Sequence, residues 1–291
     1  MRRRLLVLVV ACLSLLAAGC DVQFVAPPGA APLRYRDEIF GTVNRTNGIA
    51  YGSAVTQTGV TQTLLLDLYR PAGDTNTHRA AIVWVHGGGF TGGTRTSAEI
   101  VDEANTFARK GFVTVSIDYR LAPQGCFPVT QSCLTGIIDA KHDAQAAVRF
   151  LRANAGTYGI DPTRIAIGGS SAGAITALNV GYSPEDPGTS GNPGFPSDVR
   201  GAVSLSGAKV LTTADPGDAP ALLFHGTEDQ LVSYDAAVNT VNEARAAGLI
   251  ALLTTWEGAG HVPYTQHRTE IIDQTTNFLW WMMDLGNAPA S

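Results

Sequence analysis

Basic residues are scarce in this sequence beyond its first few positions. The chain of 291 residues carries 20 Lys and Arg against 25 Asp and Glu, which gives a formal net charge of −5. No Lys- or Arg-rich stripe follows the N-terminus, and this argues against a nucleic-acid partner. Internal repeats are also lacking, and a hydrophobic fraction of 45% is enough for one sizeable core. We therefore expect one large domain rather than two small ones.

The basic residues cluster only at the N-terminus, and this region has the organisation of an export signal. Arg2–Arg4 precede an apolar stretch, Leu5–Ala18, that is too short for a comfortable membrane span. Small residues then lead to Cys20, and this resembles the lipobox of bacterial lipoproteins, in which the cysteine is lipidated. We predict a lipoprotein-type signal peptide at 1–19 and an exported protein that contacts the membrane only through this anchor. The alternative is ordinary cleavage near the same place, which would leave Cys20 free.

Cysteine is rare as well, with four in the chain. One belongs to the signal and one is Cys20, so Cys126 and Cys133 remain, in a loop rich in Pro, Gly and Gln. In an oxidising compartment we expect this pair to form a disulfide. Two free thiols or a metal pair are the alternatives. No other Cys or His group has zinc spacing, so we expect neither a metal nor an organic cofactor.

Strand-like and helix-like segments alternate along most of the chain. After a Pro/Ala-rich stretch at 20–36, read as a tether, the catalytic domain is expected at 37–291. The alternation predicts an α/β fold with a mostly parallel sheet and helices on both faces. The expected strands are 38–43, 63–69, 81–86, 112–117, 164–168, 199–205, 220–225 and 249–255, and the expected helices are 98–110, 137–154, 234–247 and 267–285. Only about a dozen residues separate the strands at 199–205 and 220–225, which leaves no room for a large cap domain.

A serine between two glycines follows one of these strands. Gly169-Ser170-Ser171-Ala172-Gly173 lies between the strand at 164–168 and a helix-like run. This is the pattern of a nucleophile elbow, in which a tight turn exposes the serine hydroxyl and points a helix N-terminus at the reacting carbonyl. Ser171 is the candidate nucleophile of an acyl-transfer reaction.

An activated serine needs a histidine as base and an acid that orients this base. In this topology the order along the chain is serine, acid, histidine. Asp229 comes just after the strand at 220–225, where a carboxylate points into the ligand crevice of an open α/β sheet. Glu228 is the rival acid and Asp235 a weaker one. Of six histidines, His261 has the right place in this order and small neighbours on its loop. We predict Ser171, Asp229 and His261 as the catalytic residues.

A glycine run supplies candidate donors for the oxyanion. His86-Gly87-Gly88-Gly89-Phe90 follows the strand at 81–86, and main-chain N–H groups there can face a developing negative charge. Either Gly87 with Gly88 or Gly88 with Gly89 would serve, together with the N–H of Ala172. The same run matches a dinucleotide fingerprint, but its third glycine, Gly92, is a poor helix start, and we expect no nucleotide there.

Together these motifs resemble the α/β-hydrolase carboxylesterases over residues 37–285. The segments that carry the resemblance are His86–Phe90, Asp118-Tyr119-Arg120-Leu121-Ala122-Pro123, Gly169–Gly173 and the segments around Asp229 and His261. The most similar branches are the hormone-sensitive-lipase-like esterases and the small feruloyl-esterase-like group. The resemblance implies that the segment at 118–120 braces the oxyanion loop. Many lipase-like members have Asp where this chain has Ser170, which favours the small branch with an open site.

The sequence therefore predicts a serine carboxylesterase that acts through an acyl-enzyme on short-chain, small-molecule or polymer-linked esters such as sugar esters. One alternative is a serine peptidase of the prolyl-oligopeptidase type, although the chain has no room for the propeller domain that such enzymes usually carry. The other is a non-catalytic binding protein on the same scaffold.

Overall fold

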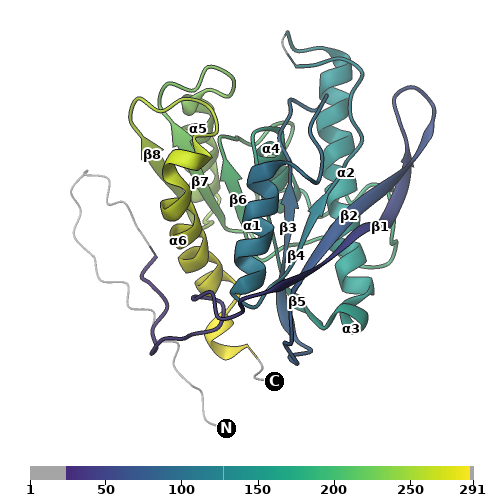
Figure 1. The fold of residues 1–291 in the computed structure, drawn as a ribbon. Coiled ribbons are helices and arrows are strands. Elements are labelled where there is room, and N and C mark those ends of the chain that lie inside the picture. Colours follow the sequence, from purple (N-terminus) through teal and green to yellow (C-terminus); the bar gives the residue numbers. More distant parts are fainter. Residues whose placement is uncertain (1–23, 127, 289–291) are drawn as a thin grey trace.

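An eight-stranded β-sheet runs through the centre of the protein, between two layers of helices (Figure 1). The computed structural model describes residues 24–126 and 128–288, so the predicted signal at 1–19 and Cys20 lie outside the described residues. The strands are β1 (Val43–Val55), β2 (Thr61–Pro71), β3 (Arg79–Val85), β4 (Val113–Ile117), β5 (Ile160–Ser170), β6 (Ala202–Leu205), β7 (Ala221–Gly226) and β8 (Ala251–Trp256). Their order in the sheet is β1-β2-β4-β3-β5-β6-β7-β8. β2 pairs antiparallel with β1 and β4, and every other pair is parallel.

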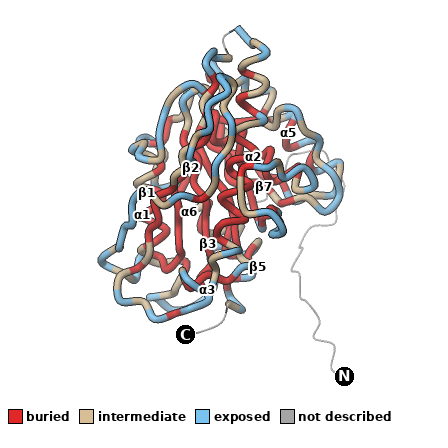
Figure 2. The backbone as a smooth tube through the Cα atoms, turned by 90° about the vertical axis from the view of Figure 1, so that its right-hand side faces the viewer, coloured by how far each residue is buried: buried red, intermediate tan, exposed pale blue. Residues whose placement is uncertain are grey.

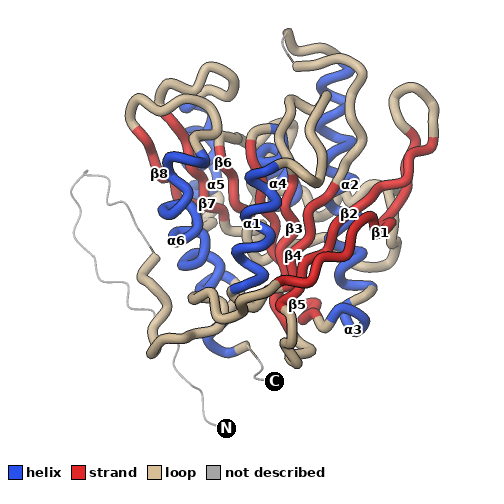
Figure 3. Tube along the Cα trace, in the orientation of Figure 1, coloured by secondary structure: helices blue, strands red, loops and turns tan. Residues whose placement is uncertain are grey.

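Helices cover both faces of this sheet (Figure 3). They are α1 (Ala98–Arg109), α2 (Gln131–Ala153), α3 (Ala155–Tyr158), α4 (Ala172–Gly181), α5 (Tyr234–Ala246) and α6 (Tyr264–Met282), followed by the short 3-10 helix η1 (Leu285–Asn287). The predicted α/β class, a mostly parallel sheet with helices on both faces, is confirmed. Residues 206–220, between β6 and β7, form neither helix nor strand. None of the helices in the described residues is long and apolar enough to cross a membrane.

Two apolar cores, one on each face, fix the sheet between the helices. In β3, Ala81, Val83 and Val85 belong to the core shared with α2, α4 and α5, whereas Ile82 and Trp84 belong to the core shared with α1 and α6. Successive side chains of a strand point to opposite faces, so a strand buried on both sides is apolar throughout. Fully burying one Val, Leu or Ile contributes about 1.5–3 kcal/mol. Buried residues accordingly fill the space between the layers (Figure 2).

Most expected elements differ from the structure by a few residues at their ends, and two of them differ most. The strand expected at 38–43 begins only at Val43 and continues to Val55. β1 is an edge strand whose residues are mostly exposed, so its apolar pattern is weak and its pairing with β2 sets its bounds. The helix expected from 137 begins at Gln131, because the Thr130 side chain accepts a hydrogen bond from Cys133 N at 3.1 Å and caps it.

Residues 20–36 were expected to form a tether. The described part of this stretch, 24–36, instead packs against the domain, so the expectation is wrong from residue 24 onward. Tyr35 is only 2% exposed and belongs to the core under α1 and α6. Its backbone N donates to Lys110 O at 2.7 Å, and its hydroxyl accepts from Ala80 N at 3.2 Å. Composition alone missed this because one buried aromatic ring and a few polar contacts hold a segment that otherwise has the composition of a linker.

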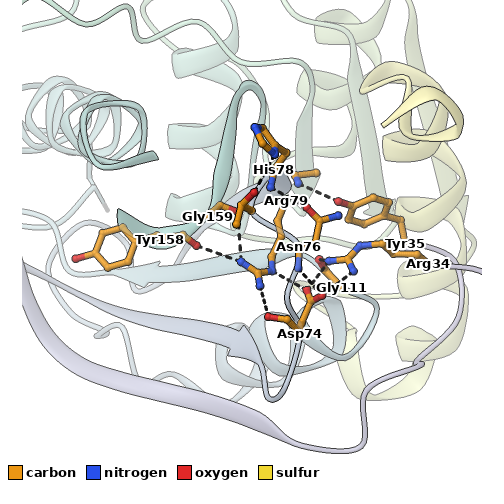
Figure 4. A network of polar contacts seen from close by, with 11 residues as sticks. Arg34, Tyr35, Asp74, Asn76, His78, Arg79, Gly111, Tyr158 and Gly159 are labelled. Carbon is orange, nitrogen blue, oxygen red and sulfur yellow. Dashed lines mark hydrogen bonds and ion pairs between the residues drawn. The ribbon is translucent and has the colours of Figure 1, made fainter. Parts of the chain in front are cut away.

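Asp74 is the centre of the polar network that holds this segment (Figure 4). Its carboxylate accepts from Arg34 Nη2 at 2.6 Å and from Arg79 Nε at 2.6 Å. Arg34 Nη2 also donates to Gly111 O at 2.6 Å, so one side chain joins the segment to the residues that follow β2 and α1. Burial acts to raise the pKa of Asp74, but the hydrogen bonds from the two arginines outweigh it and lower the pKa to about 2.

Candidate active site

A cavity of about 760 Å³ opens where the parallel strands β3, β5 and β7 end. Ligand crevices of open α/β sheets lie at this carboxyl edge. The cavity is lined by the glycine run after β3, by Ser171 after β5 and by His261 from the loop between β8 and α6. Residues that are far apart in the chain therefore meet because the strands that carry them are neighbours.

Ser171 sits on a strained turn between β5 and α4. Its backbone angles are φ 52° and ψ −117°, a conformation that costs a non-glycine residue energy and that the surrounding structure must enforce. The turn lies directly against β3: a Cβ atom on Gly173 would lie 2.0 Å from Val85 O, and one on Gly169 would lie 2.5 Å from it. The two glycines let the elbow approach the neighbouring backbone, as the predicted motif requires.

The structure brings the three predicted catalytic side chains into one hydrogen-bonded series. His261 Nε2 lies 2.7 Å from Ser171 Oγ, and His261 Nδ1 lies 2.7 Å from Asp229 Oδ2. An ionised carboxylate can only accept, so Nδ1 carries the proton and Nε2 is left to accept from the serine hydroxyl. Such an arrangement can take a proton from Ser171 as its oxygen attacks a carbonyl.

Asp229 is held ionised by its surroundings. Its other oxygen accepts from Leu231 N at 2.9 Å and from Val232 N at 3.0 Å. Burial acts to raise the pKa of this carboxyl, but the hydrogen bonds from His261 and from the two backbone N–H groups outweigh burial, and the pKa lies below its ordinary value. Within the described residues, neither rival acid, Glu228 or Asp235, forms a hydrogen bond or ion pair with a histidine.

Another histidine, His225, lies next to the series but has a different setting. It is fully buried, and its Nε2 donates to Val232 O at 2.8 Å, which ties together the loop that carries Asp229. Among the described residues Nδ1 has no hydrogen-bond partner, and burial lowers the pKa of this imidazole. His225 therefore supports the loop of Asp229, whose Oδ2 also lies 3.2 Å from His225 Nε2, and it differs in burial from the partly exposed His261.

The glycine run lines the cavity opposite the elbow. Gly87, Gly88, Gly89 and Ala172 all border the cavity that holds Ser171. Gly88 has φ 119°, and its carbonyl accepts from Gly92 N at 3.0 Å, which makes the loop a tight turn. No helix starts at Gly92, since α1 begins only at Ala98. The loop thus has the geometry of a backbone donor site rather than that of a dinucleotide turn.

The segment that the resemblance predicts as a brace contacts this loop directly. The Tyr119 hydroxyl donates to His86 O at 3.1 Å, and its ring stacks on the His86 imidazole at 4.3 Å. Ala122 N donates to Phe90 O at 2.8 Å. Both ends of the glycine run are therefore fixed by the segment at 118–122.

The rest of the cavity wall is mostly apolar. The disulfide between Cys126 and Cys133, with 5.0 Å between the Cα atoms, confirms the predicted pairing and places both residues on this wall. The apolar side chains on the wall include Val129, Leu134, Ile137, Ile175, Val210 and Leu231. In the described residues, no group of three or more His, Cys, Asp or Glu side chains is arranged to hold a metal ion.

Comparisons with known proteins agree with this geometry. A family model described as BD-FAE matches residues 66–196, and one described as Phospholipase/Carboxylesterase matches residues 134–276. Solved structures of Thermogutta terrifontis esterase 2 are similar; the native form has a TM-score of 0.68 and 22% identity, covering 89% of this chain and 98% of that chain. The chain has the α/β-hydrolase fold.

Two curated relatives match parts of this α/β-hydrolase. Human arylacetamide deacetylase-like 2 is 37% identical over 129 residues, which are 42% of this chain and 29% of that protein. Carboxylesterase NlhH of Mycobacterium tuberculosis (strain ATCC 25618 / H37Rv) is 39% identical over 92 residues, which are 32% of this chain and 25% of that protein. The chain thus spans less than a third of the length of either relative.

Sequence reasoning missed two charged groups around the site of this α/β-hydrolase. Asp143 is completely buried and accepts from Arg120 N and Arg120 Nη2, each at 2.8 Å. The sequence did contain a signal for this buried charge, because Asp143 stands beside Ala144 on the apolar face of the long helix. Glu99, in the first turn of α1, lines the cavity and had no such signal, because one acid at a helix N-terminus is usually solvated.

Proposed function

We propose that this α/β-hydrolase is a serine carboxylesterase. The hydrogen-bonded series of Ser171, His261 and Asp229, with 2.7 Å at each of its two links, carries the proposal. Its place in a cavity beside a glycine run supports acyl transfer, which needs a nucleophile, a base and oxyanion donors in one site. The named esterases among the similar proteins support the same reaction class.

In the proposed mechanism, Ser171 Oγ attacks the ester carbonyl while His261 Nε2 takes the hydroxyl proton. Asp229 keeps the imidazole in the required tautomer and stabilises its charged form. Backbone N–H groups of Ala172 and of two residues among Gly87–Gly89 hold the oxyanion. His261 then gives the proton to the departing alcohol, and water, deprotonated by the same imidazole, releases the acid from the acyl-enzyme.

The proposed substrates are esters with a modest apolar part. A largely apolar wall around a cavity of about 760 Å³ supports short acyl chains or compact aromatic groups, linked to a small alcohol or to a polymer such as a glycan. Within the described residues, the segment between β6 and β7 contains no cap domain that could cover the cavity mouth. This supports substrates in which the alcohol part of the ester is bulky.

The test is a chain-length series of p-nitrophenyl esters, from acetate to palmitate, on the purified protein. Ser171→Ala is expected to abolish turnover without unfolding the protein, because it removes only the attacking oxygen. Ser53→Ala, which changes an exposed serine of β1, is the matched control. Turnover that survives Ser171→Ala refutes the proposed nucleophile. Hydrolysis of peptide anilides without hydrolysis of esters favours the peptidase, and failure to label Ser171 with a fluorophosphonate favours a binding protein.

We also propose that the protein is exported and lipid-anchored through Cys20. The disulfide supports an oxidising compartment. The mass of the mature N-terminal peptide is the test. A diacylglyceryl cysteine at position 20 supports the anchor, and a peptide that begins with an unmodified Cys20 refutes it.

A further inference from the structure

Glu99 is the single carboxylate among the described residues that line the cavity. It lies in the first turn of α1, a helix that begins at the cavity edge after Ser97, which also borders the cavity. The Glu99 side chain is half-buried, so it is open to a ligand on one side and held by protein on the other. An ionised group in a mostly apolar cavity has a strong influence on which ligand binds there.

The carboxylate is fixed by the residue next to the nucleophile. Ser170 Oγ donates to Glu99 Oε1 at 3.1 Å, and Ser170 is 2% exposed. Since Ser170 and Ser171 are adjacent in the chain, this contact holds the negative charge beside the elbow. A carboxylate has about four acceptor positions, and the contact uses one of them. The remaining positions can accept from a ligand in the cavity.

No cation of the protein neutralises this charge in the described part of the chain, where Glu99 forms no ion pair. The lysine on the cavity wall, Lys209, is engaged elsewhere: its Nζ lies 2.6 Å from Glu243 Oε2 and donates to Thr212 O at 3.0 Å. The charge of Glu99 does reach His86, where it opposes the lowering of the imidazole pKa by burial. The cavity therefore has a negative region close to the proposed nucleophile.

We infer that Glu99 is a specificity-determining residue that accepts a hydrogen bond from a hydroxyl or ammonium group of an ester bound at Ser171. The same charge repels esters that carry an anionic group at that position. The inference rests on the proposed esterase function and names its substrate class: an amphiphilic ester, with an apolar part against the cavity wall and a hydrogen-bond donor near Glu99. The competing explanation is that Glu99 only supports the elbow through Ser170.

Charge-matched esters separate the two explanations. The acetate esters of protonated N,N-dimethylethanolamine, of its uncharged carbon analogue 3-methylbutanol and of isethionate place a cationic N–H donor, no charge and an anion at one position of similar size. The measured quantity is the ratio of kcat/KM for the cationic and the anionic ester. In Glu99→Gln the amide oxygen still accepts from Ser170 while the charge is lost, and we expect this ratio to fall about three- to tenfold.

Ser170→Ala is the matched variant, because it removes the contact with the elbow and keeps the charge of Glu99. We expect the ratio to change less than in Glu99→Gln. A second pair, glycerol monoacetate and propyl acetate, tests the hydroxyl: Glu99→Leu is expected to remove a preference for the glycerol ester that Glu99→Gln partly retains. These two pairs distinguish recognition of a cation from recognition of a hydroxyl.

Two results would overturn the inference. One is a parent protein that prefers neither the cation among the three charge-matched acetates nor glycerol monoacetate over propyl acetate. The other is a Glu99→Gln variant in which all three rates change by the same factor, which would mean that Glu99 supports only the elbow. Failure of the proposed function looks different, since the parent protein would then hydrolyse neither p-nitrophenyl acetate nor any of these esters.

Discussion

Replacing Gly173 by alanine tests whether close contact with β3 fixes the nucleophile. A Cβ atom there would lie 2.0 Å from Val85 O and 2.7 Å from His86 O, and both are backbone atoms that cannot rotate away. Real Cβ atoms keep at least 3.0 Å, so the elbow or the strand must shift by about 1 Å. Added volume in a packed interior costs about 1–3 kcal/mol. A 1 Å misplacement near the reacting atoms costs on the order of 100-fold in rate.

The assays are denaturant unfolding and kcat/KM for p-nitrophenyl acetate. We expect Gly173→Ala to lower the free energy of unfolding by about 1–3 kcal/mol and kcat/KM about 100-fold. The matched control is Gly156→Ala in α3, where no described atom outside the adjacent residues and the local helix backbone lies within 4 Å of the added Cβ. Because alanine is the better helix former, this change should raise stability by about 0.5–1 kcal/mol. A Gly173→Ala protein with parental stability and activity would refute the reasoning.

Three further predictions follow from the contacts described above. Asp229→Asn should lower kcat by on the order of 10⁴-fold, because the amide favours the wrong imidazole tautomer; steady-state kinetics with Glu228→Gln as control checks this, and a larger loss in the control would mean that the wrong acid was chosen. Asp74→Asn should lower the free energy of unfolding at pH 7 by about 1–3 kcal/mol. The folded-state pKa of Asp74 is about 2 and the ordinary value is 3.8. The stability difference between the parent protein and Asp74→Asn is therefore fully present above pH 3.8 and disappears as the pH falls towards 2. Unfolding curves at several pH values test this, and a stability difference that does not depend on pH would contradict it. Reduction of the Cys126–Cys133 disulfide, which spans 7 residues, should cost about 2–2.5 kcal/mol of stability, and unfolding curves that coincide with and without a thiol reductant would exclude this.

Much of the fold was predictable because its signals are local. Strands such as β3 are buried on both faces and therefore read as continuous apolar runs, and glycines flank the elbow where it contacts a neighbouring backbone. The order of Ser171, Asp229 and His261 follows from parallel strands, whose carboxyl ends share one edge of the sheet. These three residues could therefore be selected before any distance was known.

The features that sequence reasoning missed depend on long-range contacts. β1 takes its bounds from pairing with β2, and the segment around Tyr35 is held by the distant Lys110 and Asp74 network. Glu99 meets Ser170 across 71 positions of the chain, and no local pattern reports such a contact. Where the apolar pattern of a segment is weak, its tertiary contacts determine where the segment lies.

The path of the N-terminal segment determines how the protein faces any surface to which it is attached. Both α1 and α6 begin near the cavity, and the segment touches them at their far ends, where Tyr35 N donates to Lys110 O and Trp281 Nε1 donates to Val25 O at 2.9 Å. The first described residues therefore lie at the ends of α1 and α6 that are away from the cavity, and Figure 1 shows how this N-terminal segment runs along the outside of the two helices. For the anchor that we propose at Cys20, this arrangement places the cavity on the side away from the membrane, where it faces molecules that arrive from solution.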